Sequence, residues 1–178
     1  EASGGPVELS FADADGAVIG AFASAPSSGD EGTGTELGLP AEPGLNCFVW
    51  DMRHPGARLV PGDLAIAGKP TAPAAIPDTY AVRLSAGGAV LTQTFEIAPD
   101  PRADATQADL EAQFELHVRI RDRLSEVNDA IIELRSVRRQ LAEWIERSSG
   151  GPGGDAIAEA AGRVSEELDR TERRLMKV

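Results

Sequence analysis

The chain has 178 residues, 42% of them hydrophobic, with a mean hydropathy of -0.19, which predicts a soluble globular protein with one core or a small core plus an appended element. Acidic residues outnumber basic ones 29 to 17, and the formal net charge of -12 argues against nucleic acid or an anionic membrane surface as partner. A single cysteine excludes an internal disulfide, and no apolar run reaches the ~18 residues that a transmembrane helix needs.

Residues 7–22 predict a β-hairpin. Apolar residues alternate from Val7 to Phe11, and an Asp-Gly turn over residues 13–16 leads into a second apolar stretch. The turn resembles the start of a calcium loop, but the twelfth position is Ser24 and not the glutamate that such a loop requires. A hairpin turn is therefore the favoured interpretation.

A polar loop and a third strand are expected next. Residues 24–43 are rich in Gly, Ser, Thr, Pro and acidic residues, which predicts a long flexible loop. Residues 44–53 alternate as a strand whose larger apolar side chains, Phe48, Trp50 and Met52, share the face expected toward the core.

The opposite face of this expected strand holds Cys47, Asp51 and Arg53. Cys47 is predicted to be a small buried hydrophobe and not a reactive thiol. Asp51 and Arg53 lie two positions apart and are expected to pair, which would orient the strand but stabilise it by only about 0–1 kcal/mol.

The next segments complete an expected all-β unit. Residues 54–77 are rich in proline and predict edge-strand and loop structure, whereas residues 77–84 and 90–97 predict a strong hairpin. About seven short strands fit between residues 6 and 98, which is typical of an immunoglobulin- or fibronectin III-like sandwich. Tyr80 is predicted to bond its hydroxyl to nearby backbone, as tyrosines at the corners of such sandwiches do.

After Arg102 the apolar period changes from 2 to about 3.5, which predicts a long antiparallel helical hairpin of the coiled-coil type. The first helix is expected over about 106–147, opened by a near-complete capping box at Thr106 and Asp109, and the second over about 155–178, after a Gly/Pro loop. The expected seam of the second helix is Ile157, Ala161, Val164, Leu168, Thr171, Leu175 and Val178. The near half of the first helix, around Leu110, Phe114, Leu116 and Ile120, is expected to pack on the sandwich or on a second chain.

The predicted fold class is therefore segregated α+β. Residues 1–101 are expected to form the β-sandwich domain, with the flexible loop near 24–43, and residues 102–178 the helical hairpin.

No catalytic, cofactor-binding or metal-ligating residue is predicted, and no cofactor. His117 lies beside the apolar seam and His54 in a Pro-flanked loop, without a partner motif, so a buried or interfacial structural role is favoured for His117. Neither a nucleophile elbow nor a phosphate-binding Gly-rich loop occurs. Carboxylates are plentiful, but most occupy expected exposed positions, where burial does not tune them for glycoside hydrolysis.

Arginines on the first helix raise the alternative of a phosphate site. They are Arg119, Arg121, Arg123, Arg135, Arg138 and Arg139. Acidic residues alternate with them at spacings of three and four, so solvated, ion-paired helix faces are the favoured explanation. These acids are Glu115, Asp122, Glu126, Asp129 and Glu133.

Four short motifs follow one another along residues 40–145. They are Gly44-Leu45-Asn46-Cys47-Phe48-Val49-Trp50-Asp51-Met52-Arg53, Pro77-Asp78-Thr79-Tyr80-Ala81-Val82-Arg83-Leu84, Asp100-Pro101-Arg102 and Gln107-Ala108-Asp109-Leu110-Glu111-Ala112-Gln113-Phe114. This order resembles the C-terminal region of bacterial Asp-box (BNR) repeat β-propeller proteins, which are labelled sortilin-like or glycosyl hydrolase-like. The first motif is also similar to the immunoglobulin-like domain of flagellar hook capping proteins. The chain departs from the family pattern at Asp78, where glycine is usual, and at Cys47, where arginine is frequent.

The resemblance implies a piece of a larger bacterial protein, periplasmic or secreted, whose propeller precedes this chain. The start without methionine, in Gly/Pro-rich sequence, fits that expectation. No Asp-box occurs within these residues, so no propeller activity is carried over. The expected function is a non-catalytic accessory module that docks on the parent propeller or self-associates through the first helix, for example as a homodimer. A carbohydrate-binding module and an enzyme with an unrecognised site are the alternatives.

Overall fold

The structure is a computed structural model that describes residues 6–24, 38–42, 44–62 and 70–176. Within these residues four strands precede two helices, which confirms the α+β class. The elements are β1 (Glu8–Ala12), β2 (Val18–Ala23), β3 (Asp78–Ala86), β4 (Ala89–Ile97), α1 (Gln107–Ser148) and α2 (Gly154–Leu175).

The chain forms two compact units. Unit 1 comprises Glu1–Ala57 and Ala65–Asp122, and unit 2 comprises Arg58–Leu64 and Arg123–Val178. The division falls within α1, whereas the sequence placed a domain boundary between residues 101 and 102. Each unit is described by itself below.

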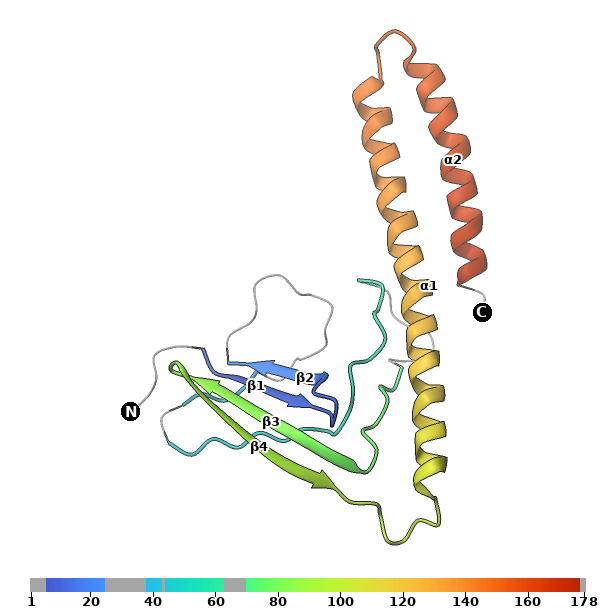
Figure 1. Ribbon diagram of the computed structural model, residues 1–178. Helices are drawn as coiled ribbons and strands as arrows, with labels where there is room; N and C mark the ends of the chain where they lie inside the picture. The colour runs from blue at the N-terminus through green and yellow to red at the C-terminus, as the bar shows by residue number, and fades with distance from the viewer. Residues whose placement is uncertain (1–5, 25–37, 43, 63–69, 177–178) are drawn as a thin grey trace. The chain divides into compact units, whose positions relative to one another are not determined.

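The strands of unit 1 form one antiparallel sheet in the order β2-β1-β3-β4 (Figure 1). Both predicted hairpins are confirmed. In the first turn, Asp13 Oδ1 accepts hydrogen bonds from the backbone N–H groups of Asp15 and Ala17, at 3.1 and 2.8 Å, so its carboxylate closes the turn. In the second, Gly87 and Gly88 have φ values of 56° and 81°, the left-handed conformation that a tight two-residue turn demands.

The predicted strand over residues 44–53 is wrong as a strand. Its only ladder contact in the described part of the chain is one bridge, between Arg53 and Ala74. Met52 has a φ of 56°, a left-handed conformation that interrupts an extended pleat. About seven strands were expected, and the described residues form four, so the second sheet of the predicted sandwich is not confirmed. The predicted flexible loop 24–43 lies mostly outside the described residues.

Ring contacts nevertheless pack Phe48 and Trp50 against the core of unit 1. Phe11, Ile19 and Tyr80 are buried, and Phe48 and Trp50 pack against them, as predicted. Trp50 stacks on Phe11 with 4.4 Å between the ring centroids. The buried indole N–H of Trp50 has no hydrogen-bond partner among the described residues, a penalty that the aromatic contacts offset.

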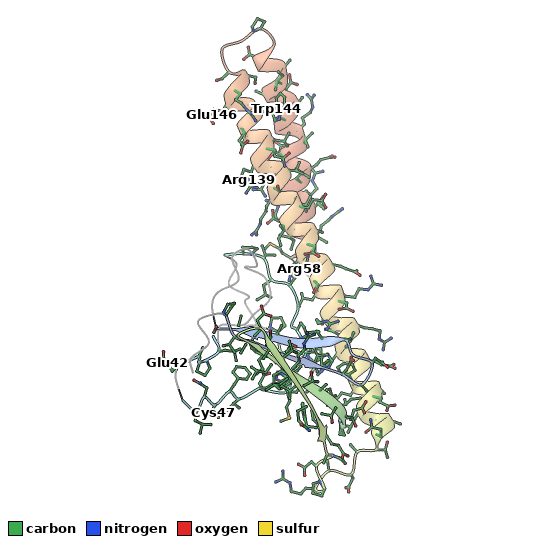
Figure 2. All side chains as sticks on the ribbon, turned by 60° about the vertical axis from the view of Figure 1, so that its left-hand side comes forward. Glu42, Cys47, Arg58, Arg139, Trp144 and Glu146 are labelled. Carbon is green, nitrogen blue, oxygen red and sulfur yellow. The ribbon has the colours of Figure 1, made fainter. Side chains whose placement is uncertain are left out.

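Two neighbours of this stretch differ from expectation. Met52 is half exposed and Cys47 is exposed (Figure 2), so Cys47 is not the buried hydrophobe that alternation predicted. Cys47 is exposed because the extended segment is covered only on the side of Phe48 and Trp50, and Cys47 lies on the opposite side. The guanidinium of Arg53 donates a hydrogen bond to the carbonyl oxygen of Ala72 at 2.7 Å, while the carboxylate of Asp51 accepts one from the backbone N–H of Arg53.

The predicted role of Tyr80 is confirmed. Its hydroxyl donates to the backbone carbonyl of Ile76 at 2.7 Å, and the ring is buried beneath the sheet. Burial, followed by the nearby charges of Asp78 and Asp13, raises the pKa of Tyr80, so the phenol keeps the proton that this bond requires.

The limits of both helices lie close to their predictions. Thr106 and Asp109 form the reciprocal cap, since each side chain accepts the backbone N–H of the other residue, at 3.2 and 3.0 Å. Gly153, with a φ of 83°, precedes α2. A Cβ on Gly154 would approach the carbonyl oxygen of Ser148 to 2.5 Å, so the tight connection between the helices requires glycine there.

Candidate interaction surface

The two histidines occupy different surroundings. His117 is exposed, so burial, one of its two expected roles, is not observed, and the interfacial role stays a prediction. His54 is half-buried and packs against Phe114 with 4.7 Å between the ring centroids. Burial and the charge of Arg121 lower the pKa of His54, against an opposing effect of Asp13. Burial and the charge of Arg121 both favour the neutral imidazole, which suits a packing role.

No group of three or more His, Cys, Asp or Glu side chains able to hold a metal ion occurs among the described residues. Other groups with perturbed acidity lie in local contacts. Hydrogen bonds from Arg102 lower the pKa of Asp100, and hydrogen bonds from Thr106 lower that of Asp109. These contacts form a turn and a helix cap, and neither faces a cavity that the described residues define.

Several arginines of α1 form ion pairs, and only some of these pairs lie within the helix. Arg123 contacts Glu126 at 2.6 Å, at the predicted spacing of three, whereas Arg121 contacts the adjacent Asp122 at 2.7 Å. Arg135 and Arg138 instead reach across to α2. Ion pairing is thus the structural role of these four arginines, and part of it joins the two helices.

Glu172 of α2 is the acceptor in that contact, and the sequence analysis did not single it out. It is 7% exposed, and its two carboxylate oxygens accept from Arg135 Nε at 2.7 Å and from Arg138 Nη1 at 2.6 Å. Arg138 also contacts Asp169 at 2.6 Å. The buried carboxylate therefore lies between two guanidinium groups, with both oxygens satisfied.

The seam of α2 agrees with its prediction at every second position and is moved by one residue at the others. Gly162 and Asp169, each next to a seam position, are also less exposed. The seam positions are Gly154, Ala158, Ala161, Ser165, Leu168, Glu172 and Leu175. They repeat at spacings of four and three, like the predicted series, and share Ala161, Leu168 and Leu175 with it. Ile157 and Val164, predicted for the seam, are 41% and 45% exposed. The helix is rotated so that Glu172 reaches its arginines.

This rotation places the exposed apolar residues of the hairpin on the side away from its bridging ion pairs. Arg135 and Asp169 each follow a seam position by one residue, a step of about 100°. The bridging ion pairs place those flanks of α1 and α2 on the same side. Positions that precede the seam by one residue must therefore share the opposite side.

That opposite side carries four exposed apolar residues among polar and charged ones, which include Gln140 and Arg147 of α1 and Glu167 and Arg174 of α2. We call the four apolar residues the apolar hairpin face, and they are Val137, Trp144, Ile157 and Val164. Trp144 is 60% exposed and lies toward the end of the hairpin where α1 gives way to α2 (Figure 2). The guanidinium of Arg147 lies 5.4 Å from the centre of its ring. Exposed apolar residues of two helices on one side, with a large aromatic among them, are a feature of protein contact surfaces.

An ion pair and hydrogen bonds of Arg58 attach the loop around this residue to α1 within unit 2. Its guanidinium contacts Asp129 at 3.0 Å, its N–H donates to Ser125 Oγ, and Asn128 donates to its carbonyl at 2.5 Å. Two residues further on, Val60 is buried. Arg58 thus joins the loop to the middle of α1.

The first turns of α1, in unit 1, have a second exposed apolar pair. Phe114 is half-buried against His54, whereas Leu116 and Ile120 are 49% and 55% exposed. Of the two expected arrangements, packing within the chain is observed for Phe114 and not for Leu116 and Ile120, for which packing on a second chain stays a prediction.

No protein-family model matches the chain, and comparisons with curated proteins and with solved structures give no significant match. In the part of the chain that the structure describes, neither helix is apolar over a length that would cross a bilayer.

Proposed function

We propose that this chain is a non-catalytic accessory module whose work is protein–protein interaction through its helical hairpin. The apolar hairpin face carries the proposal. Full burial of such side chains stabilises by about 1.5–3 kcal/mol each, so covering the exposed parts of these four would contribute roughly 4 kcal/mol before the entropy cost of association. The proposed partners are the propeller domain of a larger bacterial β-propeller protein of the Asp-box type, or another copy of this chain.

The finer fold belongs to the same proposal. We regard unit 1 as an immunoglobulin-like module in which extended segments replace part of the second sheet. The corner hydrogen bond of Tyr80 and the Trp50–Phe11 stack support it. The four-three spacing of the α2 seam similarly supports a coiled-coil type of hairpin.

Protein contact is favoured over carbohydrate binding. A sugar platform needs flat, exposed aromatic rings, and the aromatics of unit 1 are buried or half-buried. Trp144 is the exception, an exposed ring. It shares its side of the hairpin with aliphatic residues of both helices, which suits a helical partner better than a sugar.

Site-specific photo-crosslinking tests this function. p-Benzoylphenylalanine in place of Trp144 should give an adduct in cells that express the full-length protein. Mass spectrometry of the digested adduct should identify the crosslinked peptide as one from the propeller domain of the same polypeptide or as one from a second copy. The matched control is the same residue in place of Arg139, which is exposed on the charged side of α1. Absence of an adduct from position 144, or equal adducts from both positions, would contradict the proposal.

A further inference from the structure

A second, independent feature lies in unit 1, at the edge of its sheet. β4 is nine residues long and pairs with β3 along its whole length, but with no other strand among the described residues (Figure 1). Proteins usually protect such an edge with proline, lysine, a bulge or a very short strand. β4 has none of these, and Glu96 is its one charged residue. Among the described residues, the backbone of β4 therefore presents an unpaired edge.

The register with β3 fixes which backbone groups point outward. Ala86 and Ala89 flank the two-residue Gly turn and so form a hydrogen-bonded pair, after which hydrogen-bonded and non-bonded pairs alternate. Odd-numbered residues of β4 thus bond to β3. The even-numbered residues direct their N–H and C=O groups away from the sheet, and they are Val90, Thr92, Thr94 and Glu96.

The sequence of β4 is nearly symmetric about Gln93. Reading outward from Gln93, threonine stands on both sides, then Leu91 and Phe95, and then Val90 and Glu96. An antiparallel copy centred on Gln93 would place threonine opposite threonine and leucine opposite phenylalanine. These are favourable cross-strand pairs. The outward-pointing residues of the two strands would also fall opposite one another, as hydrogen-bonded pairs require.

Exposure of Leu91 indicates that this edge lacks a neighbour. Leu91 is on the same face of the sheet as Phe95, which packs on the core, yet it is 68% exposed. A second β4 in the symmetric register would bring Phe95 of the other copy beside Leu91. The two Glu96 carboxylates would lie about 20 Å apart, six residues along the strands, so they would not repel strongly.

We propose that β4 pairs antiparallel with β4 of a second copy of this chain, centred on Gln93, to form one continuous sheet across the two chains. A second copy is the occupant because the strand is nearly its own complement in side chains and in backbone register. The pairing uses none of the residues of the apolar hairpin face, so it does not depend on the function proposed for the hairpin.

Register-specific disulfide trapping tests the pairing. In a Cys47→Ser background of the whole chain, Gln93→Cys would place two thiols at a non-hydrogen-bonded pair on the axis, within disulfide range, after mild oxidation with diamide. Ala89→Cys is the matched control, because its two copies would be about 27 Å apart, eight residues along the strands. We expect the covalent dimer from Gln93→Cys to exceed that from Ala89→Cys by roughly tenfold or more.

A second variant tests the edge without cysteine. The double variant Thr92→Lys and Thr94→Lys would place lysine opposite lysine across the axis. Sedimentation equilibrium should therefore show a dimer dissociation constant at least roughly tenfold higher than that of the wild type. Thr79→Lys, on β3 and away from the edge, should leave it unchanged. Equal trapping at positions 93 and 89, no trapping at position 93, or an unshifted dissociation constant would overturn the proposal. Each outcome is independent of crosslinking at position 144.

Discussion

Replacing Glu172 gives the sharpest test of how the helical hairpin is held together. Glu172→Ala removes a carboxylate that accepts two charge-assisted hydrogen bonds, from Arg135 and Arg138, at 2.7 and 2.6 Å. Glu172→Leu removes the same charge but puts an apolar side chain at a seam position between Leu168 and Leu175. The pair of variants separates the loss of the ionic contact from the loss of packing.

The magnitude follows from burial. Breaking a fully buried ion pair costs about 3–5 kcal/mol, because the remaining charge is left without a partner. Here the side chains of Arg135 and Arg138 are 34% and 37% exposed, so water would solvate them once Glu172 is gone. We therefore expect Glu172→Ala to lower the free energy of unfolding by roughly 1.5–2.5 kcal/mol. Glu172→Leu should cost less than about 1 kcal/mol, since it regains apolar burial.

Urea denaturation followed by far-UV ellipticity measures this difference, because the helices dominate that signal. A double-mutant cycle with Arg135→Ala should give a coupling free energy of roughly 1 kcal/mol. A loss below about 0.5 kcal/mol for Glu172→Ala would refute the reasoning. So would a larger loss for Glu172→Leu than for Glu172→Ala.

Three further predictions concern unit 1. Tyr80→Phe should lower the free energy of unfolding by about 1–1.5 kcal/mol in urea titrations, because the buried carbonyl of Ile76 loses its donor. Thr106→Ala should cost about 1 kcal/mol and reduce helix content in far-UV spectra, since α1 loses its cap. The stability difference between the wild type and His54→Gln should be greatest above pH 6.5 and shrink as the pH falls, measured by denaturation at a series of pH values.

The sign for His54 follows from its lowered pKa. Between the folded pKa and the ordinary value of 6.5, the unfolded chain binds more protons than the folded one. Acid therefore favours unfolding in that window, and the contribution of the neutral imidazole is lost as the pH falls toward the folded pKa. Parallel stability curves for the two proteins would contradict this account.

The control for Thr106→Ala is Thr106→Ser. It should keep the wild-type free energy of unfolding and helix content, because serine retains the hydroxyl acceptor, and that result would support the capping assignment.

Local signals made the helices and hairpins predictable. Thr106 and Asp109 mark the start of α1 through a cap that involves four residues only, and glycines mark the end of the connection before α2. The Asp-Gly and Gly-Gly turns likewise specify their hairpins through backbone conformations that few residues adopt. The corner role of Tyr80 was predictable because its partner, Ile76, is only four residues away.

Long-range requirements explain the failures. Apolar periodicity alone could not distinguish two registers of α2 that share three seam residues. The choice depends on Glu172 meeting Arg135 and Arg138, which lie more than thirty residues earlier. Similarly, alternation placed Cys47 inside a sheet that residues 44–53 do not join. Their position is determined by ring contacts of Phe48 and Trp50 with distant strands.

The placement of the two tryptophans gives each unit its own optical reporter. Trp50, in unit 1, has a half-buried ring with its indole N–H shielded, whereas Trp144, in unit 2, is mostly exposed beside Arg147. Their fluorescence should differ in emission wavelength and in quenching by acrylamide. Trp144→Phe and Trp50→Phe would each leave one emitter. Melting curves from the two single-tryptophan proteins would then separate the cooperativity of the sheet from that of the hairpin in one spectroscopic channel.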